Sequence, residues 1–386
     1  MIIERDISTF LHDNTTWYPV VSVTGPRQSG KSTLVKELFP DFKYVNLEDE
    51  RTYSFVTKNP GDFIYEHDEH IIIDEAQRAP SIFNAIQVAS DERGTVGQYV
   101  LSGSQNFLLL KNITQSLAGR VGLIQLLPFS FVEARRARPE ISVDDFTLQG
   151  GYPHTHTSPI PLSVFFRNYL RTYIERDVNE YIHASNLKQF RTFLKLCAHN
   201  AGNLLNVSRL AKDVGIARQT VEAWLSLLES SYIIFRLPPY YTNLRKRLVK
   251  TSKLYFYDTG LLCHLLGITT PEQLRDSLQR GAIFENMIIQ EAIKHHNNRG
   301  DDAQLFFYRD ESKVEIDLID ATDVSAPQII EIKSSQTFQP RYMNHLKMIG
   351  DALDIPVSQR HLVMRGELSM SVPEGNVVAA KEWLTR

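Results

Sequence analysis

Two glycines, a lysine and a serine occur at a spacing that suits the binding of a phosphate chain. Residues 25–32 fit the pattern G-x-x-x-x-G-K-S. Glycines let the backbone curl until successive N–H groups converge on phosphate oxygens, at the positive end of the helix that follows. In such a loop we expect Lys31 to contact the β- and γ-phosphates and the Ser32 hydroxyl to ligate Mg²⁺. The predicted nucleotide-binding residues are Gly25, Pro26, Arg27, Gln28, Ser29, Gly30, Lys31, Ser32 and Thr33.

The residues on either side favour a nucleotide site over a glycine-rich turn that happens to precede a lysine. Residues 18–23 form an apolar run typical of a buried strand, and residues 33–38 have a helical pattern. Strand, loop and helix in this order are the context that the motif requires. We therefore predict that the chain binds ATP with Mg²⁺.

Two adjacent carboxylates follow a second apolar run, at residues 71–73. A continuous apolar run is typical of a parallel strand buried on both faces, and ligands bind at the carboxyl ends of such strands. We expect Asp74 to hold Mg²⁺, through water or Ser32, and Glu75 to act as the general base. Alone, a strand ending in Asp-Glu is a common turn; after a phosphate loop it favours a catalytic pair.

Three further polar residues have two interpretations each. Ser102 or Ser104, at the tip of another apolar run, could sense the γ-phosphate or could simply end a strand. Arg120 closes a helical pattern. It could stabilise transition-state charge in a neighbouring subunit, or it could lie in solvent at a helix end.

Taken together, these motifs resemble one known group of proteins. Residues 25–32, 74–77, 101–104 and 117–120 are similar to those of the AAA+ ATPases of the AAA_14 group, which carry a C-terminal DUF4143 region. The resemblance implies a five-stranded parallel sheet and favours Arg120 as an arginine finger. A finger acting between subunits implies a homo-oligomer, and turnover that rises with protein concentration.

Composition narrows the class of protein further. The chain has 386 residues, enough for two or three domains, a net charge of −3 and two cysteines, Cys197 and Cys263, in apolar helical patterns. We expect both to be reduced core thiols. Residues 1–6 lack the apolar region of a signal peptide, and no run of 18 apolar residues occurs. The sequence predicts a cytoplasmic protein with no membrane segment.

The middle of the chain has the sequence pattern of a helix-turn-helix. Ser208 caps a short helix, Gly215 supplies the turn, and a second helix from Arg218 would present Arg218, Gln219 and Glu222 outward. Two strands around a basic loop then predict a winged helix. The cations of this predicted wing are Arg245, Lys246, Arg247, Lys250 and Lys253. A wing of this charge favours phosphate contacts, although winged helices also bind proteins.

The last third of the chain contains a third set of chemical groups. Glu285 lies on the apolar stripe of a predicted helix, where a carboxylate is costly unless it is paired or binds a cation. Asp317 lies in an alternating strand, and Glu331 and Lys333 lie on one face of the next strand, opposite Ile330 and Ile332.

These four residues resemble the PD-(D/E)xK nuclease-like fold, with Ile316 in place of the proline. The resemblance implies that Asp317 and Glu331 hold Mg²⁺, that Glu285 supports the metal through water, and that Lys333 activates the nucleophilic water. Two alternatives remain open. The fold no longer cuts, or Lys333 is neutralised by Asp317 in a salt-bridged hairpin.

The sequence therefore predicts a multidomain α/β protein. We expect an AAA+ core (1–130), a helical lid (131–185), a winged helix (186–268) and a nuclease-like domain (269–386). The function predicted is ATP hydrolysis coupled to nucleic acid, DNA rather than RNA, with DNA cleavage as a further step. The alternatives are an ATP-gated switch acting on a protein partner, a DNA-binding ATPase that does not cut, and a small-molecule kinase.

Overall fold

The N-terminal part of the chain forms a five-stranded parallel sheet. The computed structural model describes residues 2–67, 70–103, 116–174, 186–240 and 251–386. The strands are β1 (Val20–Thr24), β2 (Lys43–Asn46), β3 (Ile71–Asp74), β4 (Tyr99–Gly103) and β5 (Val121–Gln125). They are all parallel and lie in the order β2-β3-β4-β1-β5. Every residue of β1, β3 and β4 is buried, as their apolar runs predict.

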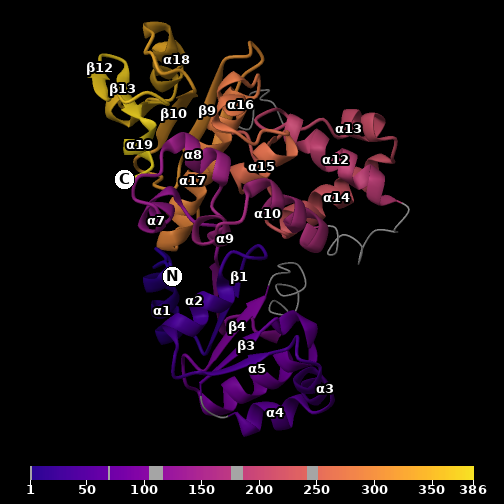
Figure 1. Cartoon of the computed structure of the whole chain (residues 1–386). Coiled ribbons are helices and arrows are strands. Elements are labelled where there is room, and N and C mark those ends of the chain that lie inside the picture. Colours follow the sequence, from indigo (N-terminus) through magenta and orange to yellow (C-terminus); the bar gives the residue numbers. More distant parts are fainter. Residues whose placement is uncertain (1, 68–69, 104–115, 175–185, 241–250) are drawn as a thin grey trace.

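Helices cover both faces of this sheet (Figure 1). One core joins β1, β3 and β4 to α3, α4 and α5, and a second core joins the other face to α1 and α2. The predicted five-stranded parallel sheet is therefore confirmed. The helices are α1 (Ser8–Trp17), α2 (Lys31–Leu38), α3 (Glu50–Lys58), α4 (Pro60–Glu66) and α5 (Ser81–Arg93), with a 3₁₀ turn η1 (Ala76–Arg78) after β3.

The middle of the chain is mostly helical and ends in a two-stranded antiparallel sheet. Helices α12, α13 and α14 are followed by β6 and β7, the element order that the sequence predicts for a winged helix. The elements are α7 (Phe131–Ala137), α8 (Val143–Gln149), α9 (Pro153–Thr157), α10 (Leu162–Tyr169), the π-helical turn η2 (Leu170–Ile174), α12 (Leu187–His199), α13 (Val207–Val214), α14 (Arg218–Ser230), β6 (Ile234–Leu237), β7 (Lys253–Phe256), α15 (Thr259–Leu265) and α16 (Pro271–Asp276).

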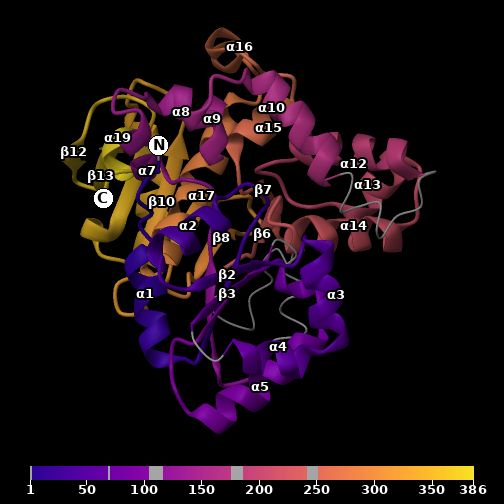
Figure 2. The ribbon, with the colours of Figure 1, turned by 60° about the horizontal axis from the view of Figure 1, so that its bottom comes forward.

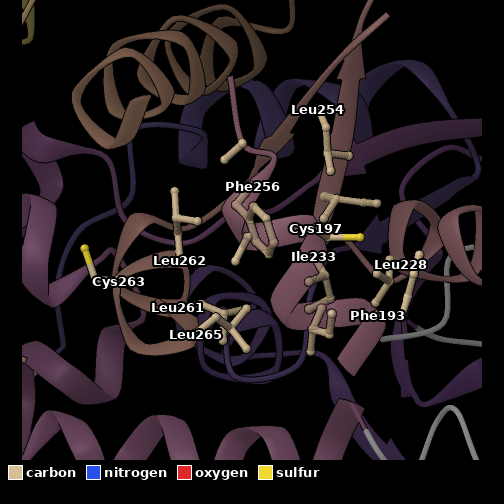
Figure 3. Packing of buried hydrophobic residues seen from close by; sticks show 14 of the residues in the cluster. Phe193, Cys197, Leu228, Ile233, Leu254, Phe256, Leu261, Leu262, Cys263 and Leu265 are labelled. Atoms are coloured by element: carbon tan, nitrogen blue, oxygen red, sulfur yellow. The ribbon is translucent and has the colours of Figure 1, made fainter. Parts of the chain in front are cut away.

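One hydrophobic core unites most of these helices. Phe166 of α10 belongs to the same buried cluster as Phe193 of α12 and Leu261 of α15. Figure 3 shows the last two of these residues. Cys197 is buried within this cluster, Cys263 is buried in α15, and both are free thiols, as expected. This core thus joins helices on both sides of the predicted boundary at residue 185, and the domain limits stay a prediction.

The C-terminal part is a second sheet, of mixed direction. Its six strands lie in the order β12-β13-β11-β10-β9-β8, with β10, β11 and β13 parallel and the others antiparallel to their neighbours. Helix α17 covers one face and α18 the other. The elements are α17 (Arg280–Arg299), β8 (Leu305–Arg309), β9 (Glu315–Asp320), β10 (Gln328–Lys333), η4 (Pro340–Met343), α18 (Asn344–Ala352), η5 (Val357–Gln359), β11 (Arg360–Met364), β12 (Met370–Val372), β13 (Gly375–Ala379) and α19 (Ala380–Trp383).

The small β6–β7 sheet lies near the middle of the molecule, beside β8 (Figure 2). Side chains of β6 and β7 enter the core that α17 and the C-terminal sheet form. The middle segment is therefore packed against the C-terminal sheet rather than joined to it by a free linker.

Candidate active sites

The phosphate loop between β1 and α2 needs its glycines for steric reasons. Gly25 and Gly30 have φ values of 150° and 95°, and a Cβ on Gly25 would collide with the carbonyl of Leu126. Gln28, between them, also has a positive φ, of 60°. The loop thus has the curled backbone that the motif predicts.

The loop is built to receive an anion. Helix α2 begins at Lys31 with no side-chain cap, which leaves its first-turn N–H groups available for phosphate oxygens. The Lys31 ammonium lies inside the loop and donates to the carbonyls of Gly25 at 3.0 Å and Pro26 at 2.8 Å. The Ser29 hydroxyl is buried, with no hydrogen-bond partner in the described part of the chain. These residues fit a nucleotide phosphate chain.

Asp74 lies beside the loop, at the end of β3, and is the centre of a hydrogen-bond network. It accepts from the Ser32 hydroxyl at 2.6 Å, from the Tyr44 hydroxyl at 2.6 Å, and from the Ser102 hydroxyl. Burial alone would raise the pKa of Asp74, but the hydrogen bonds from Ser102, Ser32 and Tyr44 outweigh it and lower the pKa. Asp74 and Ser32, the two predicted Mg²⁺ ligands, therefore lie side by side.

Glu75 has the environment of a general base. Its backbone is left-handed, with φ 55°, and its carboxylate accepts from Gln77 at 2.5 Å. Such a conformation is rare for a residue with a side chain and is found preferentially at functional sites. Burial raises the pKa of Glu75, with Lys31 and Arg27 opposing the shift. A raised pKa makes Glu75 a stronger base toward water.

The other predicted residues of this site have different outcomes. Ser102 lies within the site but donates to Asp74, and Ser104 is outside the described residues. Arg120 precedes β5, so it lies at the end of the strands opposite the phosphate loop, about 16 Å away over five residues. Its guanidinium binds both carboxylate oxygens of Asp91. Arg120 therefore reaches no phosphate in its own chain, and a role between subunits stays a prediction.

Sequence reasoning did not identify Tyr44 or the cavity beside the loop. Tyr44 and Asn46 are two residues apart and lie on the same face of β2, and Asn46 pairs in register with Asp74. Strand periodicity could therefore have indicated that the Tyr44 side chain lies near Asp74. The cavity has a volume of about 640 Å³, and its lining includes Gly30 and Thr33 of the loop together with Ile3 and Pro153. Its size and partly apolar wall suit the nucleoside part of ATP.

Arg5 connects the phosphate loop to the segment that follows the sheet. Its buried guanidinium donates to the carbonyls of Ser29 at 2.9 Å and Leu127 at 2.6 Å, and to the Glu133 carboxylate at 2.9 Å. Glu133 is itself fully buried. Because a buried charge is tolerated only when it is paired, this contact fixes the N-terminal residues against the loop.

The four predicted residues of the C-terminal site lie together. The Lys333 ammonium is 2.5 Å from a Glu331 carboxylate oxygen and 3.7 Å from Asp317. Asp317 accepts from the backbone N–H of Ile332 at 2.7 Å. Glu285, on α17, is close enough to both Asp317 and Glu331 for their charges to interact. As predicted, Ile330 and Ile332 lie on the face of β10 opposite to that of Glu331, since both isoleucines pack in the core that contains α17.

Lys253 is a correction to the predicted wing. It is 2% exposed, so it contacts no phosphate from the surface. Its ammonium is 3.0 Å from Glu285 and 2.5 Å from Glu315, and the Tyr255 hydroxyl donates to the same Glu285 oxygen at 2.5 Å. Lys253 and Tyr255 are two residues apart on β7, so both side chains lie on the same face of the strand. There they supply the partners that the buried Glu285 requires.

Two carboxylates of this cluster hold protons more tightly than usual. Burial, and then the charge of Asp317, raise the pKa of Glu331 to about 8 and that of Glu285 to about 7. One Glu331 oxygen is buried without a hydrogen-bond partner in the described ranges. Among the described residues, no group of three His, Cys, Asp or Glu side chains is placed to hold a metal ion, so Mg²⁺ at Asp317 and this Glu331 oxygen stays a prediction.

The remaining predicted contacts lie on the middle segment. Arg218 and Gln219 are exposed at the start of α14, whereas Glu222 is 3.6 Å from Arg236 of β6. The other four cations of the predicted wing, at positions 245, 246, 247 and 250, lie outside the described residues.

The fold and the first site together define a class of protein. A phosphate loop at the carboxyl edge of a parallel sheet ordered β2-β3-β4-β1-β5, with Asp74 and Glu75 beside it, is the arrangement of a P-loop ATPase. Residues 18–135 match the family model described as an AAA domain, AAA_14, and residues 280–383 match the domain of unknown function DUF4143. The chain thus combines a region that matches AAA_14 with a region that matches DUF4143. A third model, the domain of unknown function DUF8612, matches residues 140–272.

Similar proteins occur in bacteria and archaea. The uncharacterized protein Rv2008c of Mycobacterium tuberculosis is 29% identical over 355 residues, covering 87% of this chain and 75% of its own. The uncharacterized protein MJ1544 of Methanocaldococcus jannaschii is 22% identical over 324 residues, covering 75% and 69%. A solved Walker-type ATPase of Pyrococcus abyssi is 18% identical, with a TM-score of 0.45, covering 69% of this chain and 96% of that one. Among the described helices, none is long and apolar enough to cross a membrane.

Proposed function

We propose that the protein is a Mg²⁺-dependent ATPase whose nucleotide state controls phosphodiester hydrolysis on DNA at the C-terminal site. Glu75 would accept a proton from the attacking water, and Lys31 would balance the charge of the phosphates. Mg²⁺, held by Ser32 and Asp74, would supply further positive charge to the phosphates when bound.

The observation that carries this proposal is that the small β6–β7 sheet, with the residue just ahead of it, connects the two sites. The Thr24 hydroxyl, directly before the phosphate loop, is 2.8 Å from the Tyr232 hydroxyl, just ahead of β6. On the paired strand β7, Lys253 and Tyr255 bind Glu285. A shift of β6–β7 with the nucleotide would therefore change how Glu285 is held.

Lys333 of the C-terminal site suits a phosphate substrate. Lys333 sits between Asp317 and Glu331, where it can orient a water and stabilise charge that develops on phosphate oxygens. Mg²⁺ would be held by Asp317 and the unpartnered oxygen of Glu331 and would lower the pKa of a bound water. DNA is the expected substrate because a helix-turn-helix segment with exposed Arg218 and Gln219 belongs to the same chain.

The decisive experiment measures DNA cleavage and ATP hydrolysis in the same tubes, with Mg²⁺ or Mn²⁺ and with and without ATP. The proteins are the wild type, Asp317→Ala and Lys31→Ala. The matched control is Asp323→Ala, which removes an exposed carboxylate just beyond β9. We expect DNA cleavage to be lost in Asp317→Ala and kept in Asp323→Ala. In Lys31→Ala, we expect that ATP no longer changes the rate of DNA cleavage.

Two results would overturn parts of this proposal. Absence of cleavage by the wild type under all conditions, with ATPase activity stimulated by DNA, would leave a DNA-dependent ATPase without a nuclease. ATPase activity indifferent to DNA would remove DNA as the partner and favour an ATP-gated switch acting on another protein.

A further inference from the structure

One buried arginine holds the phosphate loop from the side of the N-terminal residues. The Arg5 guanidinium donates to the Ser29 carbonyl at 2.9 Å and to the Leu127 carbonyl at 2.6 Å. The loop and the segment after β5 also lie tightly together, since a Cβ on Gly25 would be 2.1 Å from the Leu126 carbonyl oxygen. Arg5 therefore bridges the loop and the segment that packs against it.

The contact with Ser29 sets the orientation of one peptide group of the loop. The Ser29 carbonyl and the Gly30 N–H belong to the same peptide unit, and in a planar trans peptide these two groups point in opposite directions. A carbonyl held by Arg5 therefore turns the Gly30 N–H away from Arg5. This N–H donates to no acceptor in the described part of the chain. The backbone N–H groups of such a loop are the donors that receive nucleotide phosphates.

Arg5 acts through hydrogen bonds rather than through net charge. Its Nε donates to the fully buried Glu133 carboxylate at 2.9 Å, so that the two charges balance. The same carboxylate accepts from the backbone N–H groups of Asp6 at 2.8 Å and Ser130 at 2.9 Å. Glu133 is thus fixed in place, and it fixes the planar guanidinium in turn.

We propose that Arg5 is a positioning residue for ATP hydrolysis, which holds the peptide between residues 29 and 30 with its N–H ready for a phosphate oxygen. Arg5 lies outside residues 18–135, the range that matches the AAA domain model. Donors that are already oriented cost no rearrangement in the reaction, and an error of about 1 Å in such placement can lower a rate about 10²-fold. This inference rests on the proposed function, because it requires that the loop binds and hydrolyses ATP.

The test measures kcat and KM for ATP, and the affinity for ADP, with the full chain and Mg²⁺. Arg5→Lys keeps a cation for Glu133, but an ammonium lacks the planar fork that also reaches the two carbonyls. We expect kcat/KM to fall about 10²-fold. The affinity for ADP should fall about tenfold, which corresponds to one hydrogen bond to a charged group.

The matched control is Arg136→Lys. Arg136 holds the same N-terminal segment from the surface, through the Glu4 carbonyl at 2.8 Å and the Asp6 carboxylate at 2.5 Å. If Arg5 acts only by anchoring this segment, the two variants should behave alike. We expect Arg136→Lys to keep the wild-type kcat, KM and affinity for ADP.

A second variant separates positioning from stability. Arg5→Met/Glu133→Gln removes both buried charges together, so that neither is left unpaired. Thermal unfolding is measured for every variant. We expect the double variant to be folded at the assay temperature and to hydrolyse ATP as poorly as Arg5→Lys. Activity that follows the unfolding temperature across all variants would assign Arg5 a purely structural role.

Three further outcomes decide the inference. A folded Arg5→Lys with wild-type kcat/KM and affinity for ADP would overturn it, while the ATPase stands. If the wild type binds ADP without hydrolysing ATP, the proposed function fails, and the affinity of Arg5→Lys for ADP still shows whether Arg5 positions the loop. If the wild type binds no ADP, both proposals are overturned.

Discussion

At the scale of the residue, hydrogen bonds and burial shift the pKa values of Asp74 and Glu331 in opposite directions. Asp74 accepts three hydroxyl hydrogen bonds, and its pKa is lowered. Glu331 has one oxygen without a partner among the described residues and lies near Asp317, and its pKa is raised. The same chemical group therefore stays ionised at Asp74 and holds its proton more tightly at Glu331.

The role of Glu75 is tested by removing its charge alone. Glu75→Gln should lower the rate of ATP hydrolysis about 10²- to 10⁴-fold, the usual contribution of a general base, while ATP binding persists. The measurement is steady-state ATPase activity beside equilibrium nucleotide binding. The control is Glu66→Gln, an exposed change on α4. A Glu75→Gln protein with normal turnover would assign the base to another residue.

The raised pKa of Glu331 predicts how stability depends on pH. Because the folded protein holds this proton more tightly than the unfolded chain, the stability that it contributes is complete below about pH 4.5 and is lost as pH rises toward about 8. Glu331→Gln should therefore stabilise the protein relative to wild type more at pH 8 than at pH 5, as measured by urea unfolding.

The control for this prediction is Glu311→Gln, an exposed change before β9 that should show no such pH dependence. Added Mg²⁺ at pH 8 should stabilise the wild type and leave Glu331→Gln almost unaffected. An equal effect of Mg²⁺ on both proteins would argue against Glu331 as a ligand.

At the scale of the element, β7 and α17 depend on each other through a buried ion pair. Lys253 and Tyr255 approach Glu285 from β7, and Glu291 and Lys294 of α17 bind the backbone of Phe131 and Phe129 at 2.7 and 2.9 Å. Helix α17 is therefore held both by the small β6–β7 sheet and by the segment that leaves the first sheet.

Removing Lys253 tests its assignment to the interior. Lys253→Met should destabilise the fold by about 3–5 kcal/mol, because it leaves buried carboxylates without their cation. A surface lysine such as Lys58 should tolerate the same change within about 0.5 kcal/mol. The second variant Lys253→Met/Glu285→Gln should recover part of the loss, as measured by chemical unfolding. If Lys253→Met left the free energy of unfolding unchanged, the Lys253 side chain would lie in solvent and not in the interior.

At the scale of the whole molecule, Arg120 raises the question of assembly. It lies at the edge of the first sheet opposite the phosphate loop, where it binds Asp91. Only a neighbouring copy of the chain could place it against a nucleotide. If it acts there, catalysis requires an oligomer.

Mixing two inactive proteins tests this arrangement. Arg120→Ala and Glu75→Gln should each hydrolyse ATP poorly, but mixed oligomers should regain activity, because some sites then combine an intact Glu75 with an intact Arg120 from the neighbour. Wild-type turnover per subunit should also rise with concentration. Two results together would assign Arg120 a structural role. The mixture would be no more active than the two variants measured separately, and wild-type turnover per subunit would not depend on concentration.

Much of the molecule could be predicted from the chain alone because its signals are local. The phosphate loop lies within one strand–loop–helix unit, and Asp74 and Glu75 end an apolar run, so neighbours in sequence determine their geometry. Period-two alternation likewise placed Glu331 and Lys333 on one face of a strand. Each of these inferences needs only the residues within about one element.

The contacts between the parts were decided by tertiary structure. Lys253 has the local pattern of a basic wing, yet its partner Glu285 lies 32 residues away and draws it into the interior. Arg5 finds Glu133 across 128 residues, and Thr24 meets Tyr232 across 208. Periodicity says which face of an element a side chain occupies but not which other element packs there. For that reason the links between the sites emerge only from the packed molecule.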